Sequence, residues 1–202
     1  IGLESSIKAI TNHTMGYCEP DLIIIGGGPG EGKTTFALQE AYHLAKNGHP
    51  VAFICMEMKS FQLCWKIFSS LIEESIMSIR MAKFKDDLKW LQLDKIVEDM
   101  QNMPLYIVDA TGQNINQITA LTKEFKRKYK IEMLFIDYLQ LISGGSEKNF
   151  GNRELEVAYI SRKLKENCMK MSLPTMALSQ LTVEKGTKRM YELNDLRESK
   201  AI

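Results

Sequence analysis

Residues 23–38 join a short apolar run, a glycine-rich turn and the start of a helical pattern. Within them, residues 27–34 fit the spacing G-x-x-x-x-G-K-[ST], which is informative when a strand precedes it and a helix follows. Glycines allow backbone N–H groups to converge on a polyphosphate, and the N-terminus of the following helix adds a favourable dipole. The pattern therefore predicts a phosphate-binding loop, and the alternative is a plain glycine-rich turn between a strand and a helix.

This loop is expected to hold the terminal phosphates of a nucleotide. Lys33 should reach the β and γ phosphates, and the hydroxyl group of Thr34 should ligate Mg²⁺. The complete set of expected loop contacts is Gly27, Gly28, Pro29, Gly30, Glu31, Gly32, Lys33, Thr34 and Thr35.

Three further polar residues follow apolar runs that read as strands: Glu57, Asp137 and Gln180. Phosphoryl transfer depends mainly on positioning and charge stabilisation, so an enzyme that cleaves a nucleotide needs a metal, a group that orients water and a sensor of the γ-phosphate. We assign Asp137 to Mg²⁺, Glu57 to the general base and Gln180 to the sensor. Taken alone, Glu57 is also explained as a carboxylate at the start of the next helix, and a glutamine after a strand would mean little.

Apolar runs alternate with helical patterns along the chain. The predicted strands lie at 22–25, 51–56, 103–109, 132–137 and 174–180. The predicted helices lie at 1–13, 33–47, 61–74, 86–100, 115–129 and 154–171, while 75–85 shows no firm pattern. This alternation predicts an α/β fold with a parallel, doubly wound sheet. Ligands bind such sheets at the carboxyl ends of the strands, where the polar residues named above should meet.

Composition limits the class of protein. The chain has 202 residues, 45% hydrophobic and 25% charged, which indicates one globular domain. Its 26 Lys and Arg against 25 Asp and Glu give a net charge of +1, so any nucleic-acid surface must be local. No stretch approaches the roughly 18 to 20 apolar residues of a membrane span. The cysteines are scattered like reduced thiols, so we expect a cytoplasmic protein; they are Cys18, Cys55, Cys64 and Cys168.

Several motifs, taken in chain order, carry a resemblance to a known family. They are Met56-Glu57-Met58, Phe135-Ile136-Asp137-Tyr138-Leu139-Gln140-Leu141, Asn152-Arg153 with Ile160-Ser161-Arg162-Lys163-Leu164-Lys165, Ala177-Leu178-Ser179-Gln180-Leu181 and Asp195-Leu196-Arg197-Glu198-Ser199. With these motifs the chain resembles the DnaB-type replicative helicases from about residue 16 to residue 202. The Asp-Tyr-Leu-Gln-Leu and Asp-Leu-Arg-Glu-Ser runs are more specific than the phosphate loop, which many NTPases share.

The resemblance implies a RecA-like P-loop NTPase fold, with a mostly parallel sheet and helices on both faces. It implies hydrolysis of ATP with Mg²⁺ between the subunits of a homo-hexameric ring. It also implies 5′ to 3′ translocation on single-stranded DNA during replication, with a primase or a helicase loader as a further partner. Carried over to this chain, Glu57 is the catalytic glutamate, Gln180 the coupling glutamine and Lys33 the phosphate lysine, and Thr34 and Asp137 hold the metal.

The resemblance places the DNA contacts near the end of the chain. The loops at 143–152 and 182–194 would face the ring channel, and the expected DNA-binding residues are Lys185, Lys188, Arg189, Arg197, Glu198 and Lys200. Thr182-Val183 stand where the family usually has Asn-Arg, and Lys200 stands where it usually has Gly, which adds a candidate phosphate contact. Residues 182–200 hold five basic and four acidic side chains, so a solvated loop is the alternative.

The resemblance also predicts how the chain is divided. We expect residues 1–202 to form a single RecA-like ATPase domain that is incomplete at its C-terminus. The arginine finger should lie outside the chain, and the family's N-terminal helical domain should be absent. Three other interpretations stay open: a recombinase or clock-type ATPase of the same fold, a small P-loop kinase, and an ATP-binding switch or loader. The last would hydrolyse little, because hydrolysis in this family needs an arginine from the neighbouring subunit.

Overall fold

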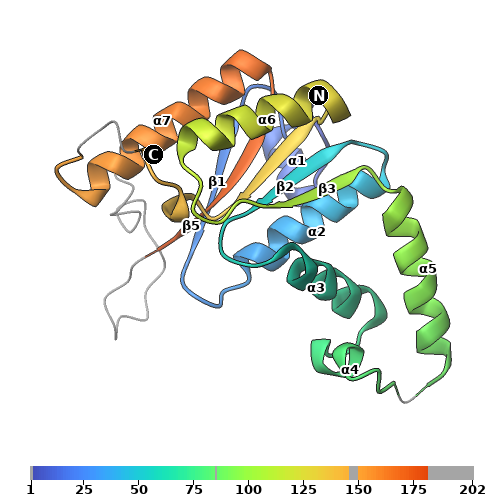
Figure 1. Cartoon of the computed structure of the whole chain (residues 1–202). Coiled ribbons are helices and arrows are strands. Elements are labelled where there is room, and N and C mark those ends of the chain that lie inside the picture. The colour runs from blue at the N-terminus through green and yellow to red at the C-terminus, as the bar shows by residue number, and fades with distance from the viewer. Residues whose placement is uncertain (1, 85, 146–149, 182–202) are drawn as a thin grey trace.

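A parallel sheet organises the computed structural model, which describes residues 2–84, 86–145 and 150–181 (Figure 1). Its strands are β1 (Leu22–Gly27), β2 (Val51–Cys55), β3 (Leu105–Asp109), β4 (Met133–Asp137) and β5 (Thr175–Gln180). They lie in the spatial order β1-β5-β4-β2-β3, and each neighbouring pair is parallel. The predicted α/β class and parallel sheet are therefore confirmed.

Helices connect these strands in the alternation that the sequence predicted. In chain order they are α1 (Lys8–Thr14), α2 (Lys33–Lys46), α3 (Ser60–Ile72), α4 (Ile76–Arg80), α5 (Leu88–Asn102), α6 (Ile115–Tyr129), the 3₁₀ turn η1 (Leu139–Leu141) and α7 (Arg153–Met171). Helices α3, α4 and α5 all lie between β2 and β3. The sequence patterns missed α4 and η1, because one or two turns contain too few residues to show a period.

The first helix begins later than its apolar pattern predicted. Residues 2–7 are not helical, and Leu3 pairs with Tyr17 in an isolated antiparallel bridge. The hydroxyl of Ser5 accepts a hydrogen bond from the backbone N–H of Ile7 at 3.1 Å. Serine side chains that bond nearby backbone groups compete with helix formation. The helix therefore starts only at residue 8.

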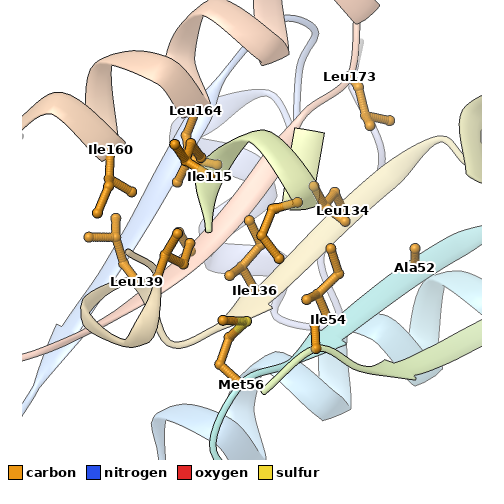
Figure 2. Close-up of a cluster of buried hydrophobic side chains, with 14 of the residues drawn as sticks. Ala52, Ile54, Met56, Ile115, Leu134, Ile136, Leu139, Ile160, Leu164 and Leu173 are labelled. Carbon is orange, nitrogen blue, oxygen red and sulfur yellow. The ribbon is translucent and has the colours of Figure 1, made fainter. Parts of the chain in front are cut away.

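Side chains alternate along the strands between two cores, one on each face of the sheet. On the face covered by α6 and α7, Ile54 and Ile136 pack in one cluster with Leu164 (Figure 2). On the face covered by α2 and α3, the rings of Phe53 and Phe135 stack with centroids 5.8 Å apart. Burial on both faces explains why the strands are unbroken apolar runs in the sequence.

The described cysteines are all free thiols, as the sequence predicted. Cys55 and Cys168 are buried, whereas Cys18 and Cys64 are partly exposed. Burial raises the pKa of the Cys55 thiol to about 12, so this group stays protonated at neutral pH. Within the described ranges, none of the helices combines the length and the apolar character that crossing a membrane requires.

Tyr17→Phe should lower the free energy of unfolding by about 1 to 3 kcal/mol, because it leaves a buried carboxylate short of one donor. Glu40 on α2 is fully buried, and it accepts hydrogen bonds from the Tyr17 hydroxyl at 2.9 Å and from the backbone N–H of Ser6 at 3.1 Å. Denaturant unfolding followed by circular dichroism measures the change. Tyr42→Phe, which removes the hydroxyl of a partly exposed tyrosine on the same helix, is the control.

The Tyr17 hydroxyl also makes the free energy of unfolding depend on pH. Burial, the largest cause, raises the pKa of Tyr17 above its usual value of 10.0, and the Glu40 carboxylate raises it further. The unfolded chain therefore loses this proton first as the pH rises, so the stabilisation is complete below about pH 10 and declines above it. Tyr17→Phe should flatten this decline, and an equally steep decline in the variant and the wild type would contradict the assignment.

Candidate functional site

Six of the nine predicted phosphate-loop residues and the three predicted strand-end residues line one cavity of about 290 Å³. The six are Pro29, Gly30, Gly32, Lys33, Thr34 and Thr35; Gly27, Gly28 and Glu31 are not among its lining residues. Register explains why they meet: Gly27 is opposite Gln180 in the β1–β5 pair, and Cys55 is opposite Asp137 in the β2–β4 pair. A larger cavity of about 900 Å³ lies at the amino ends of the strands, near His49 and Pro174, and is lined by none of the predicted residues. Chemistry therefore identifies the smaller cavity as the candidate site.

The phosphate loop is held in shape before any ligand is considered. Gly30 and Gly32 have φ values of 76° and 86°, in the left-handed region that glycine adopts most easily. The ammonium group of Lys33 donates hydrogen bonds to the carbonyl oxygens of Gly27 at 2.8 Å and Gly28 at 2.7 Å. The Glu31 carboxylate accepts from the N–H of Gly28 at 2.7 Å. Glu31 thus braces the loop, and α2 begins at Lys33 with its N-terminus beside the cavity.

Thr34 and Asp137 join the loop to the end of β4. The Thr34 hydroxyl donates a hydrogen bond of 2.7 Å to the Asp137 carboxylate, which is only 4% exposed. Burial is the main reason that the pKa of Asp137 is raised; the Thr34 bond opposes this, the Glu57 charge adds to it, and the charges of Lys66 and Lys33 oppose it. A hydroxyl and a carboxylate in contact are oxygen ligands of the kind that Mg²⁺ prefers beside phosphate oxygens and water.

A magnesium ion bound by Thr34 and Asp137 would take its other ligands from water and substrate phosphates. In the described part of the chain, no group of three or more His, Cys, Asp or Glu side chains could hold a metal ion. Mg²⁺ commonly keeps several waters and binds through one or two protein oxygens together with substrate phosphates. The Thr34–Asp137 pair therefore fits a nucleotide-bound magnesium ion.

Glu57 follows β2 and lines the cavity with an exposed side chain. The alternative role as the carboxylate that starts α3 is filled by other residues in the described chain. Asp109, at the end of β3, accepts from the backbone N–H of Ser60 at 2.6 Å, and Gln62 accepts from that of Lys59 at 3.0 Å. These two acceptors take the N–H groups at the start of α3, whereas Glu57 lines the cavity.

Gln180 is the last residue of β5 and also lines the cavity. Its backbone N–H donates to the side-chain oxygen of Gln140 at 3.2 Å. Gln140 lies within the motif at 135–141, but no role was assigned to it from the sequence, because its partner lies 40 residues away and only the fold brings the two together.

Lys66 is the second residue that the sequence analysis missed. It lies on α3, lines the cavity and lowers the pKa of Asp137 through its charge. One signal was available in the sequence, since Lys66 is the single charged residue within α3. A lone cation in an otherwise uncharged helix that starts at the carboxyl edge of a sheet is a candidate anion contact.

The expected DNA-binding residues are not placed by the structure. They lie outside the described residues, as do residues 146–149 of the loop expected to face the channel; the six are Lys185, Lys188, Arg189, Arg197, Glu198 and Lys200. Their role stays a prediction.

Comparisons with known proteins agree on one family. The family model described as DnaB-like helicase C terminal domain matches residues 2–202. The probable plasmid replicative DNA helicase of Chlamydia psittaci is 33% identical over 205 residues, which cover 100% of this chain and 44% of that protein. Replicative DNA helicase DnaC of Bacillus subtilis (strain 168) is 32% identical over 204 residues, again with 100% and 44% covered. The chain thus spans less than half the length of these relatives.

Solved structures show the same fold. One of them, an ATPase domain, superposes with a TM-score of 0.91 at 28% identity, covering 100% of this chain and 72% of that one. A structure of a DnaB-like replicative helicase, described together with its interactions with primase, has a TM-score of 0.90 at 27% identity and covers 100% of this chain and 49% of that one. The RecA-like arrangement expected from the motifs is confirmed by these neighbours.

Proposed function

Because the chain belongs to the DnaB-like helicase C-terminal domain family, we propose that it is the ATP-hydrolysing motor part of a replicative DNA helicase. The observation that carries the proposal is the contact between Thr34 and Asp137. It joins a phosphate loop to a strand-end carboxylate within the cavity that Glu57 and Gln180 also line. This is the set of groups that cleavage of a nucleoside triphosphate requires.

Each residue of the cavity is assigned a role in ATP hydrolysis. The Lys33 ammonium, now bonded to two loop carbonyl groups, would turn to the β and γ phosphates. Thr34 and Asp137 would hold Mg²⁺, which neutralises charge on the phosphate oxygens when bound. Glu57 would orient the attacking water and accept its proton. Gln180 would contact the γ-phosphate.

Lys66 extends this assignment beyond the residues predicted from the sequence. Lys66 lines the same cavity as Lys33, from the neighbouring helix α3. A second positive charge there favours the ionised form of Asp137 and attracts a polyphosphate. We therefore assign Lys66 to the phosphate-binding set.

The remaining assignments follow the family and its relatives. We propose that the complete protein forms a homo-hexamer, hydrolyses ATP at its subunit interfaces and moves 5′ to 3′ on single-stranded DNA in the cytoplasm. The DNA contacts would come from the basic residues between 185 and 200. A primase is the favoured partner protein, because a similar helicase has been described with its primase interactions, and a helicase loader is the second.

The test is ATP turnover by the complete protein at increasing protein concentration, with and without single-stranded DNA. A motor that hydrolyses at subunit interfaces should gain turnover per subunit as it assembles, and gain more when DNA is added. Binding of ATP without turnover in every condition would instead favour a switch or a loader. ATP turnover per subunit that changes with neither protein concentration nor single-stranded DNA would contradict the helicase assignment.

A further inference from the structure

The side chain of Gln140 replaces a missing strand partner at the end of β5. Pairing between β4 and β5 stops at Ile136–Ala177, whereas β1 pairs with β5 as far as Gln180. Gln140 fills this gap: its amide nitrogen donates to Ser179 Oγ at 2.9 Å and to the Gln180 carbonyl oxygen at 3.1 Å, and its oxygen accepts from Gln180 N–H. The backbone of Gln180 is therefore held on both sides.

Arg153 continues this network from Gln140 to the first turn of α7. Its guanidinium donates to the carbonyl oxygens of Gln140 and Ile142, the latter at 3.3 Å, and to the Glu156 carboxylate. Glu156 in turn accepts from the backbone N–H of Gly144 at 2.7 Å. Although burial raises the pKa of Glu156, the bonds from Gly144 and Arg153 lower it below its usual value overall. The carboxylate that joins the two is thus ionised at neutral pH.

The network ends at Gly144, which faces the ring of Phe150. We call these two residues the loop base. A Cβ atom added to Gly144 would lie 2.3 Å from the Phe150 ring, so the two sides of the loop are in contact. The Phe150 ring in turn lies 5.2 Å from the Tyr159 ring on α7. One terminal nitrogen of the planar Arg153 guanidinium bonds the carbonyl oxygens of Gln140 and Ile142, and the other bonds Glu156, so these partners are held in a fixed arrangement. A displacement at Gln180 should therefore move the loop base rather than be absorbed along the way.

We propose that Gln140, Arg153 and Glu156 are positioning residues that couple Gln180 to Gly144 and the start of α7. The proposal rests on the proposed function, in which Gln180 contacts the γ-phosphate. In this arrangement, a change at the γ-phosphate shifts Gln180, Gln140 follows it, and Arg153 transfers the shift to the loop base and to α7. Because coupling between two sites is reciprocal, a ligand that moves Gly144 would also alter the position of Gln180.

The first test uses the complete protein with Mg·ATP and saturating single-stranded DNA. Gln140→Leu removes all three bonds to β5 at similar volume, and Arg153→Ala removes the guanidinium. Each should lower the DNA-stimulated kcat about tenfold while KM for ATP changes less than about twofold, within the range of coupling changes produced by single substitutions. Arg153→Lys, which keeps the charge without the guanidinium, should restore only part of the stimulation.

The matched control is Lys170→Ala. This variant breaks the i,i+4 ion pair between Lys170 and Glu166, which lies near the other end of the same helix and has an N–O distance of 3.7 Å. It should leave the DNA stimulation unchanged. A purely structural role for Arg153 would instead lower the melting temperature and reduce basal and stimulated turnover by the same factor, and that result would overturn the proposal.

A second readout separates this proposal from the helicase assignment. Amide hydrogen exchange at Gly144 and in the first turn of α7 should change when a non-hydrolysable ATP analogue binds the wild type, and should not change in Arg153→Ala at matched nucleotide occupancy. If DNA fails to stimulate the wild type, the proposed function fails, while the exchange result still decides the coupling. Exchange that responds equally in both proteins, or in neither, would refute it.

Discussion

Replacing Glu57 with glutamine should leave ATP·Mg²⁺ binding in place and lower hydrolysis in the assembled protein by about 10²-fold or more. The amide has nearly the same size as the carboxylate but cannot accept a proton from the attacking water. The residue lines the cavity beside Lys33 and Thr34, where a water opposite the γ-phosphate would lie. Nucleotide binding by calorimetry and hydrolysis under single-turnover conditions measure the two effects separately.

Asp109→Asn is the matched control for this change. Asp109 ends the strand next to β2, and it performs the structural role that Glu57 could have had, because it accepts from the backbone N–H of Ser60 at the start of α3. Asparagine keeps an acceptor there, so this variant should bind and hydrolyse ATP as the wild type does. If Glu57→Gln also hydrolyses normally, Glu57 is not the general base.

Much of the fold could be predicted because the strands are buried on both faces. A strand such as β2 reads as an unbroken apolar run, and its observed limits, Val51–Cys55, lie within the predicted 51–56. Strand order could not be predicted in the same way, since nothing in an apolar run specifies its neighbour. In the structure β5, the last strand in the sequence, lies between β1 and β4.

Some residues of the candidate site could be predicted from the sequence, and others could not. Glu57, Asp137 and Gln180 could be placed together from sequence, because the carboxyl ends of parallel strands share one edge. Their chemical roles stay predictions, whereas their positions around one cavity are now described. Lys66 and Gln140 were missed because each acts across a tertiary contact: one reaches the cavity from the middle of α3, and the other pairs with a strand end 40 residues away.

Local competition explains the clearest error. The apolar spacing of residues 1–13 fits a helix, yet the structure begins the helix at Lys8. The two serines before it bond to other partners, Ser5 to Ile7 N–H and Ser6 to the buried carboxylate of Glu40. Glu40 lies on α2, so the spacing of residues 1–13 could not reveal this contact.

Lys33→Ala should weaken ATP binding by about 10²- to 10³-fold and remove measurable turnover, while the protein stays folded. Opposite unit charges about 4 Å apart attract by about 4 kcal/mol at an effective dielectric constant near 20, and each 1.4 kcal/mol corresponds to about a factor of ten. The buried side of α2, which includes Ala37 and Ala41, does not involve the ammonium group. Calorimetry with ATP and a thermal melt measure affinity and folding.

Lys46→Ala controls for the loss of a lysine from the same helix. Lys46 lies at the opposite end of α2, with its ammonium 5.8 Å from the centre of the Tyr42 ring. This variant should bind ATP as tightly as the wild type. Because adenosine lacks the phosphates that Lys33 is assigned to hold, Lys33→Ala should bind adenosine with unchanged affinity, and the loss should appear only for the phosphorylated ligand. Equal weakening for ATP and adenosine would mean that the loop has collapsed, and unchanged ATP affinity and turnover would remove the phosphate-loop assignment.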